Sequence, residues 1–231
     1  MKKQVLFLTV FVLLLASACR PKTSQTQQEK QTEVATHSSI FEIVGDSTIN
    51  ADKLKQLCEQ QQLCGQVYQW KNHLILFGSF PNLIETEQMI GTAYPNTTIK
   101  VYDKAFYEFN RKRCNDTTTV AAWDHTIMTA NLVADTTMQK EYMDYHATQF
   151  ENWPEVSNGF CNAGFQQLLV FRNGRQLMLV ISIPQGESLD ELDPKTTENN
   201  PRVDEWNAIM KNYQEGIEDA APGETWVVFK N

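Results

Sequence analysis

FQQLLVFRNGRQLMLVISI, residues 165–183, is the stretch of the sequence from which the fold can be read. Two mainly apolar runs, 165–171 and 176–183, have the length of strands in a buried sheet. Between them lies Asn173-Gly174, a dipeptide that is a strong signal for a tight hairpin turn. The stretch therefore predicts an antiparallel β-hairpin.

On either side of the hairpin, the pattern predicts one strand and one helix. Residues 126–133 have the composition of a strand, and residues 137–150 follow as a helix. After the hairpin, apolar side chains recur every three or four residues, as on one face of a helix: Val203, Trp206, Met210, Tyr213 and Ile217. Residues 225–229 form the last strand. The resulting order, βαββαβ, is the ferredoxin-like arrangement.

The residues before this unit repeat the same order. Asn50 can cap a first helix at 52–61, and Pro81 opens a second helix. The predicted strands of this copy are 40–44, 67–70, 74–80 and 98–102. Because its first helix carries no pair of tyrosine and histidine, a degenerate copy would supply a barrel partner but no second site.

A four-stranded sheet of this kind is covered by helices on one face, so its other face must also be buried. We predict an α+β fold in which two ferredoxin-like βαββαβ units pack as an intrachain dimeric α+β barrel. The predicted boundaries are 40–110 for the amino-terminal unit, 111–122 for a polar linker and 123–231 for the carboxy-terminal unit. In the alternative, each half pairs with another chain.

The first 39 residues indicate export. Lys2 and Lys3 precede a short apolar run and small residues before Cys19, a pattern that resembles a bacterial lipobox. We therefore expect residues 1–18 to be a lipoprotein signal peptide, Cys19 to be lipidated and residues 19–39 to be a flexible polar tether. No aspartate follows the cysteine, which favours the outer membrane of a Gram-negative cell, on its periplasmic or outer face. An ordinary signal peptide with a chance cysteine is the alternative.

The charge of the chain limits its partners. The formal charge is −8, and loss of Lys2 and Lys3 with the signal takes it to −10. An acidic chain without a basic patch argues against nucleic acid as a partner. The expected contact with a membrane is therefore the lipid alone.

Four cysteines remain if Cys19 carries a lipid. In an oxidising compartment an even number permits disulfides. Cys58 and Cys64 are close enough in sequence to pair, which would leave Cys114 and Cys161, but buried unpaired thiols are equally compatible with the sequence. No CxxC or Cys/His spacing indicates zinc, so we predict no metal site.

Tyr142 and His146 are the candidate catalytic residues. Their spacing of four places both side chains on one face of the predicted helix, one turn apart. A histidine that titrates near neutral pH beside a phenol can serve as an acid/base pair. Pairs of this kind are also common by chance, so the interpretation depends on the residues that follow.

An ordered series of residues follows the pair. It consists of Trp153-Pro154-Glu155, Ala163-Gly164, the hairpin, Asn200-Pro201 leading to Val203 and Trp206, and Thr225–Phe229. This series resembles the L-rhamnose mutarotase family, dimeric α+β barrel proteins that interconvert sugar anomers. The resemblance covers roughly residues 123–229.

The resemblance implies roles for individual residues. Tyr142 matches the family's sugar-contacting tyrosine, and His146 matches its proton-donating histidine. Trp206 matches the first of two adjacent tryptophans that line the pocket, while Asn207 stands where the second would be. The family's tyrosine on the first hairpin strand falls at Leu168. The pocket should therefore hold its sugar differently from a rhamnose enzyme.

Trp153 is a second candidate for stacking on the sugar, with a purely structural role in the loop as the alternative. Anomer exchange requires the ring oxygen to gain a proton while the anomeric hydroxyl loses one. One acid and one base suffice, so the resemblance implies no cofactor. We assign His146 as the principal acid/base and Tyr142 as its partner or a hydroxyl clamp.

The predicted function is interconversion of the α and β anomers of a monosaccharide, with a deoxyhexose favoured, by an exported lipoprotein. The alternative is a non-catalytic lipoprotein that binds a sugar or a protein through the mouth of the same barrel.

Overall fold

The computed structural model describes residues 37–63 and 65–231. The predicted signal peptide at 1–18, the lipidation site at Cys19, nearly all of the tether and Cys64 lie outside the described residues. Within the described ranges, the structure contains no helix with the length and apolar character needed to cross a membrane.

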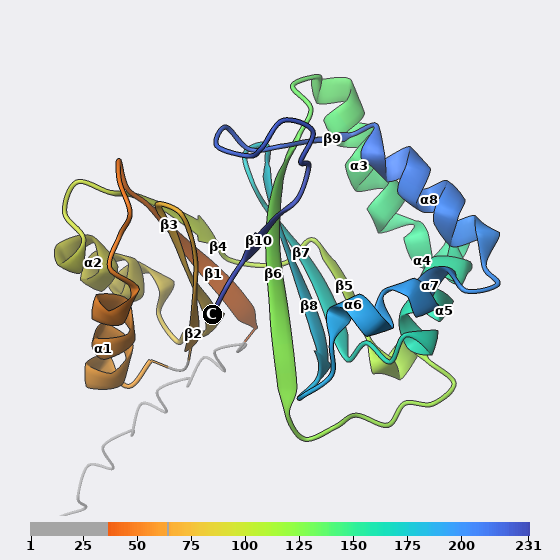
Figure 1. Cartoon of the computed structure of the whole chain (residues 1–231), viewed down its shortest axis with the longest axis horizontal. Coiled ribbons are helices and arrows are strands. Elements are labelled where there is room, and N and C mark those ends of the chain that lie inside the picture. Colours follow the sequence, from red (N-terminus) through yellow and green to blue (C-terminus); the bar gives the residue numbers. More distant parts are fainter. Residues whose placement is uncertain (1–36, 64) are drawn as a thin grey trace, which may run out of the picture. The chain divides into compact units, whose positions relative to one another are not determined.

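The amino-terminal half forms the predicted βαββαβ unit (Figure 1). Its elements are β1 (Ser38–Val44), α1 (Ala51–Gln61), β2 (Gly65–Trp70), β3 (His73–Ser79), α2 (Leu83–Ala93) and β4 (Thr98–Tyr102). The four strands form one antiparallel sheet in the order β2-β3-β1-β4. Asn50 caps α1 as predicted, because its side-chain oxygen accepts from the backbone N–H groups of Asp52 and Lys53.

The carboxy-terminal half has more elements than the sequence predicted. They are β5 (Tyr107–Asn110), the short helix η1 (Arg111–Arg113), β6 (Trp123–Leu132), α3 (Thr136–Ala147), α4 (Gln149–Asn152), α5 (Pro154–Asn162), β7 (Gln167–Asn173), β8 (Gln176–Pro184), α6 (Leu189–Leu192), α7 (Pro194–Thr197), α8 (Pro201–Lys211), β9 (Gln214–Glu215) and β10 (Val227–Phe229). The sheet runs in the order β10-β6-β8-β7-β5, with β9 paired to β6.

The predicted hairpin is confirmed as β7 and β8, which pair from Gln167↔Ser182 to Asn173↔Gln176. Gly174 has a φ of 59° and takes the first central position of the turn. An L-residue with a side chain is strained in that conformation, so glycine is the residue that permits the turn there.

Residues 107–110 do not belong to the first sheet, although the sequence analysis placed them in the amino-terminal unit. They form β5, which pairs antiparallel with β7 so that Tyr107 lies opposite Val170 and Phe109 opposite Leu168. Tyr107 and Phe109 are buried while Glu108 is exposed, which is the alternation of a strand with one buried face. The two buried side chains pack into the core between the second sheet and its helices. The segment after β5, expected to be a linker, is joined to α5 by a disulfide between Cys114 and Cys161. In the first unit, Cys58 is a buried free thiol.

The two sheets bury one face against each other, which confirms the predicted α+β fold of two ferredoxin-like units. Alternate residues of β7 and β8 point toward the first sheet, while their neighbours point toward the helices. The core between the sheets contains Ile40, Tyr68, Ile75, Phe77, Tyr102, Ile127, Leu169, Phe171, Met178, Val180 and Phe229. Gln69 and Lys230 join the sheets at one edge through two backbone hydrogen bonds of 2.7 and 3.0 Å.

Helices cover the outer face of each sheet. In the first unit, α1 and α2 close over a layer of apolar side chains that includes Phe41, Leu54, Leu76 and Ile90, all fully buried or nearly so. In the second unit, α3, α5 and α8 cover the sheet (Figure 1). Tyr145 of α3 contacts Trp206 of α8, with ring centroids 6.0 Å apart.

Candidate active site

A cavity of about 430 Å³ lies between the outer face of the second sheet and its helices. Aliphatic side chains from β6, β7 and β8 form one side of it: Met128, Leu168, Val170, Leu179 and Ile181. The aromatic lining consists of Tyr107, Tyr142, Phe160, Phe165, Trp206 and Trp226. The polar lining consists of His146, Asp193, Asn207, Lys211, Gln214 and Thr225. A largely apolar cavity with a few convergent polar groups is typical of a small-molecule site.

The cavity is not at the mouth between the two sheets, where the sequence analysis expected the site. Leu168 and Val170 point toward the helices, whereas Leu169 and Phe171 point into the core between the sheets. The apolar core between the sheets is built from side chains of both. The cavity instead lies on the helix-covered face, where Tyr142 and His146 can reach it.

His146 is held in one orientation and one protonation state. It is 8% exposed, and its Nδ1 lies 2.9 Å from the backbone carbonyl of Tyr142. A carbonyl only accepts hydrogen bonds, so Nδ1 carries the proton and Nε2 keeps its lone pair. Among the described residues, Nε2 has no hydrogen-bond partner. Burial lowers the pKa of His146 to about 4, so the ring is neutral at pH 7 and Nε2 is a proton acceptor.

Tyr142 presents the complementary group. It is 2% exposed, and its hydroxyl oxygen accepts a hydrogen bond of 3.3 Å from Nε2 of Gln214. Trp226 donates its indole N–H to the other end of the same amide at 3.1 Å, which fixes the direction of the chain of bonds. Burial raises the pKa of Tyr142, so the hydroxyl keeps its proton. Because the hydroxyl accepts from Gln214, its own hydrogen is available to a ligand.

Comparison with known proteins agrees with this geometry. A family model described as L-rhamnose mutarotase matches residues 126–231. An L-fucose mutarotase of Xanthomonas campestris is 31% identical over 93 residues, which are 40% of this chain and 72% of that protein. This chain belongs to the L-rhamnose mutarotase family.

Two further similarities extend the comparison. A UPF0734 protein of Dictyostelium discoideum is 30% identical over 104 residues, 42% of this chain and 77% of that protein. Among solved structures, a monooxygenase-like protein from Listeria innocua aligns over 85% of this chain and 95% of its own, with 13% identity and a TM-score of 0.42. The mutarotase match lies in the half of the chain that contains the cavity.

The structure brings most of the predicted mutarotase residues to the cavity. Tyr142, His146, Trp206, Asn207 and Leu168 all line it. The rings of Tyr142 and His146 are 4.3 Å apart between centroids, and Trp206 lies 5.3 Å from His146. The arrangement provides a proton acceptor, a proton donor and an aromatic surface within one cavity.

Trp153, predicted as a second stacking residue, does not line the cavity. Its ring lies under the guanidinium of Arg202 at 3.8 Å and against Trp206 at 5.6 Å. Its backbone carbonyl accepts a hydrogen bond of 2.6 Å from Gln149. These contacts agree with the structural alternative, in which Trp153 supports the segment between α4 and α5.

Sequence reasoning missed several residues of the cavity. The sequence analysis assigned no role to Gln214 or Trp226, which orient the Tyr142 hydroxyl, although Trp226 lies in the Thr225–Phe229 segment of the series that resembles the family. Tyr107 was missed because the sequence analysis predicted no strand between residue 102 and the linker. The alternation of Tyr107-Glu108-Phe109-Asn110 is the signal that could have identified a strand there.

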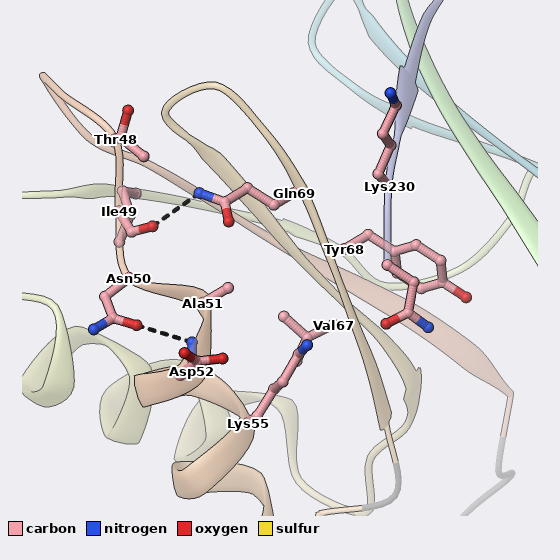
Figure 2. Close-up of a pocket in the computed structure, with 11 residues that line it drawn as sticks. Thr48, Ile49, Asn50, Ala51, Asp52, Lys55, Val67, Tyr68, Gln69 and Lys230 are labelled. Atoms are coloured by element: carbon pink, nitrogen blue, oxygen red, sulfur yellow. Dashed lines mark hydrogen bonds between the residues drawn. The ribbon is translucent and has the colours of Figure 1, made fainter.

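A second hollow of about 540 Å³ lies beside α1 and is shown in Figure 2. Two of its polar side chains already form hydrogen bonds: the side-chain oxygen of Asn50 caps α1, and the amide of Gln69 donates to the carbonyl of Ile49 at 2.8 Å (Figure 2). It holds no histidine, and Tyr68 is the phenol in its lining. The cavity lined by Tyr142 and His146, here called the mutarotase cavity, is therefore the better candidate for catalysis.

Proposed function

We propose that this protein is a mutarotase that interconverts the α and β anomers of a free monosaccharide. The observation that carries the proposal is the pairing of a proton acceptor, Nε2 of His146, with a proton donor, the hydroxyl of Tyr142, in one apolar cavity. Family membership supports the reaction class.

The protonation states assign the direction of each proton transfer. Neutral His146 takes the proton of the anomeric hydroxyl, and Tyr142 gives its proton to the ring oxygen as the ring opens to the aldehyde. A phenol of raised pKa can protonate the strongly basic alkoxide that forms at the ring oxygen. Rotation about the C1–C2 bond and reversal of both transfers close the ring with the opposite configuration. His146 thus begins as the base, rather than as the proton donor that the family resemblance implied.

The lining of the cavity supports a deoxyhexose as substrate. Trp206 offers an aromatic face to the apolar face of a pyranose ring. Val170, Leu179 and Ile181 offer aliphatic surface to a methyl group at C6. Asn207, exposed at the edge of the cavity, offers an amide to sugar hydroxyls.

Saturation-transfer NMR on anomer pairs tests the activity. L-rhamnose, L-fucose, galactose and glucose are each measured with and without enzyme. We expect faster exchange for at least one deoxyhexose than for glucose, because the methyl group fills the aliphatic side of the cavity. Exchange rates equal to the uncatalysed rates for all four sugars would contradict the proposal.

Binding without turnover is the second candidate function, and two residues favour it. Leu168 and Asn207 stand where the family resemblance places a tyrosine and a tryptophan, so two contacts to the sugar are altered. A sugar that binds in calorimetry, while its anomers exchange at the uncatalysed rate, would select this function.

We also propose that the protein is exported and anchored to the outer membrane through a lipid on Cys19. The proposal is supported by the basic residues, the apolar run and the small residues before that cysteine. In cells given a labelled fatty acid, we expect the wild-type chain to carry the label and Cys19→Ser to lack it. Equal labelling of the two chains would exclude Cys19 as the anchor.

A further inference from the structure

The segment of residues 106–116, here called the β5 strap, precedes the region that matches the mutarotase family, which begins at residue 126. It nevertheless forms part of the cavity. β5 pairs with the outer edge of β7, and Tyr107 lines the cavity beside its partner Val170. The strap therefore extends the sheet side of the site by one strand.

One end of the strap is attached to α4, the short helix that directly follows the helix of the catalytic pair. The Tyr107 hydroxyl donates a hydrogen bond of 2.7 Å to Oε1 of Gln149, at the start of α4. Gln149 is fully buried, and its Nε2 donates to the carbonyl of Trp153 at 2.6 Å. A buried amide satisfied at both ends holds its partners in place, because breaking either bond leaves a polar group unpaired.

The other end of the strap is attached to a second wall of the cavity. The Cys114–Cys161 disulfide joins it to α5, whose residues Val156 and Phe160 line the cavity. Between the two ends, the guanidinium of Arg113 lies 3.5 Å above the ring of Phe150. That ring in turn stacks on Tyr107, with centroids 5.3 Å apart and planes at 12°.

The strap also covers the imidazole of His146. The ring of Tyr107 meets it edge to face at 5.2 Å and 87°, and the ring of Phe106 meets it at 5.7 Å and 71°. The other aromatic rings in contact with it are Tyr142 and Trp206. Two of these four rings thus come from outside the region that matches the family.

We propose that the β5 strap forms part of the sugar site. Tyr107 of the strap is a positioning residue and, together with Phe106, shields the imidazole of His146 from water. The inference rests on the proposed function only in taking His146 as the base of the reaction. The carboxy-terminal region that matches the family is then incomplete as a site without this strap.

The seal has an electrostatic consequence. Burial is the main cause of the low pKa of His146, and the hydrogen bond to the Tyr142 carbonyl only partly opposes it. The titratable groups that face the cavity from the packed elements are Tyr107 of β5, Tyr142 of α3, Lys211 of α8 and, beside α7, Asp193. The tyrosines remain neutral at pH 7. Admission of water next to the imidazole should therefore raise its pKa toward the ordinary value of 6.5.

NMR titration of His146 in the full chain tests the seal and requires no turnover. In Tyr107→Leu we expect its pKa to rise from about 4 toward 6.5. Tyr107→Phe keeps the ring and loses only the bond to Gln149, so its His146 should titrate close to the wild type. Tyr94→Leu is the matched control, since it removes a buried phenol that bonds to the Asn50 carbonyl at 2.9 Å in the other unit. An unchanged His146 titration in folded Tyr107→Leu would overturn the proposal.

Two further measurements separate a failure of the strap proposal from a failure of folding or of the proposed function. If Tyr107→Leu does not fold, Phe106→Leu removes the second ring and should raise the same pKa, and an unchanged value there would equally overturn the seal. The rate of anomer exchange against pH should show its acid limb displaced upward together with the His146 titration. Absence of exchange in the wild type would count against the proposed function, whereas the titration would still decide on the strap.

Discussion

Replacement of His146 by alanine is expected to slow anomer exchange by about 10²–10⁴-fold, the usual contribution of a general acid/base. The variant loses Nε2 of His146, the proposed acceptor of the proton from the anomeric hydroxyl, and the aromatic rings around it supply no replacement. Saturation-transfer NMR on the best sugar measures the effect. Sugar binding should fall much less than the rate, because Trp206 and the aliphatic lining remain.

His125→Ala is the matched control for this experiment. His125 is a half-buried histidine of β6 in the same unit, and its Nδ1 lies 2.8 Å from the hydroxyl of Ser182. It does not line the mutarotase cavity. Its replacement should leave the exchange rate close to that of the wild type. Equal rates for wild type and His146→Ala would remove His146 from the mechanism.

Replacement of Glu42 by alanine is expected to destabilise the fold by about 3–5 kcal/mol, the usual cost of removing one partner from a buried ion pair. Glu42 is fully buried, and its carboxylate binds His73 at 2.7 Å and Tyr102 at 3.0 Å. Gln176 of the second sheet donates to the same carboxylate at 3.0 Å, and Lys100 lies 3.5 Å away. Denaturant unfolding at pH 7 measures the difference in free energy.

Glu215→Ala is the control for the loss of a carboxylate at the surface. Glu215 forms an ion pair with Arg175, and both side chains are exposed at the surface. Pairs of this kind contribute about 1 kcal/mol or less. A similar loss of stability in both variants would show that the buried network between the sheets has no special role.

The stability that Glu42 contributes should depend on pH. Burial alone would raise the pKa of Glu42, but the hydrogen bond from His73 and the charge of Lys100 outweigh it, and the pKa is lowered below 4.5. A lowered pKa means that the contribution is complete above about pH 4.5 and is lost as the pH falls through the folded-state value. Unfolding free energies of wild type and Glu42→Ala should therefore converge in acid. Curves that stay parallel would contradict this linkage.

Local patterns in the sequence were sufficient for a large part of this result. The hairpin at Asn173-Gly174, the cap at Asn50 and the spacing of Tyr142 and His146 each depend on neighbouring residues, so each is visible in a short window. The repeated βαββαβ order also implied that two apolar sheet faces had to be buried against each other. That requirement predicts the observed packing of the two sheets face to face.

The placement of the site depended on contacts between distant residues. Whether Leu168 or Leu169 faces the helices is a question of register, and a one-residue slip would exchange them. Trp153 was a second candidate for stacking on the sugar, but its ring packs under Arg202 and does not line the cavity. The protonation state of His146 likewise follows from its burial.

The Tyr142–His146 pair therefore belongs to the part of the protein that its sequence specifies locally, since a helix places residues four apart on one face whatever surrounds it. The direction of the Tyr142 hydroxyl and the protonation state of His146 are set by segments far away in the chain. Gln214 directs the Tyr142 hydroxyl, and the rings of Phe106 and Tyr107 cover His146. Burial and hydrogen-bond direction are properties of the packed chain, because they depend on which distant groups exclude water from one another.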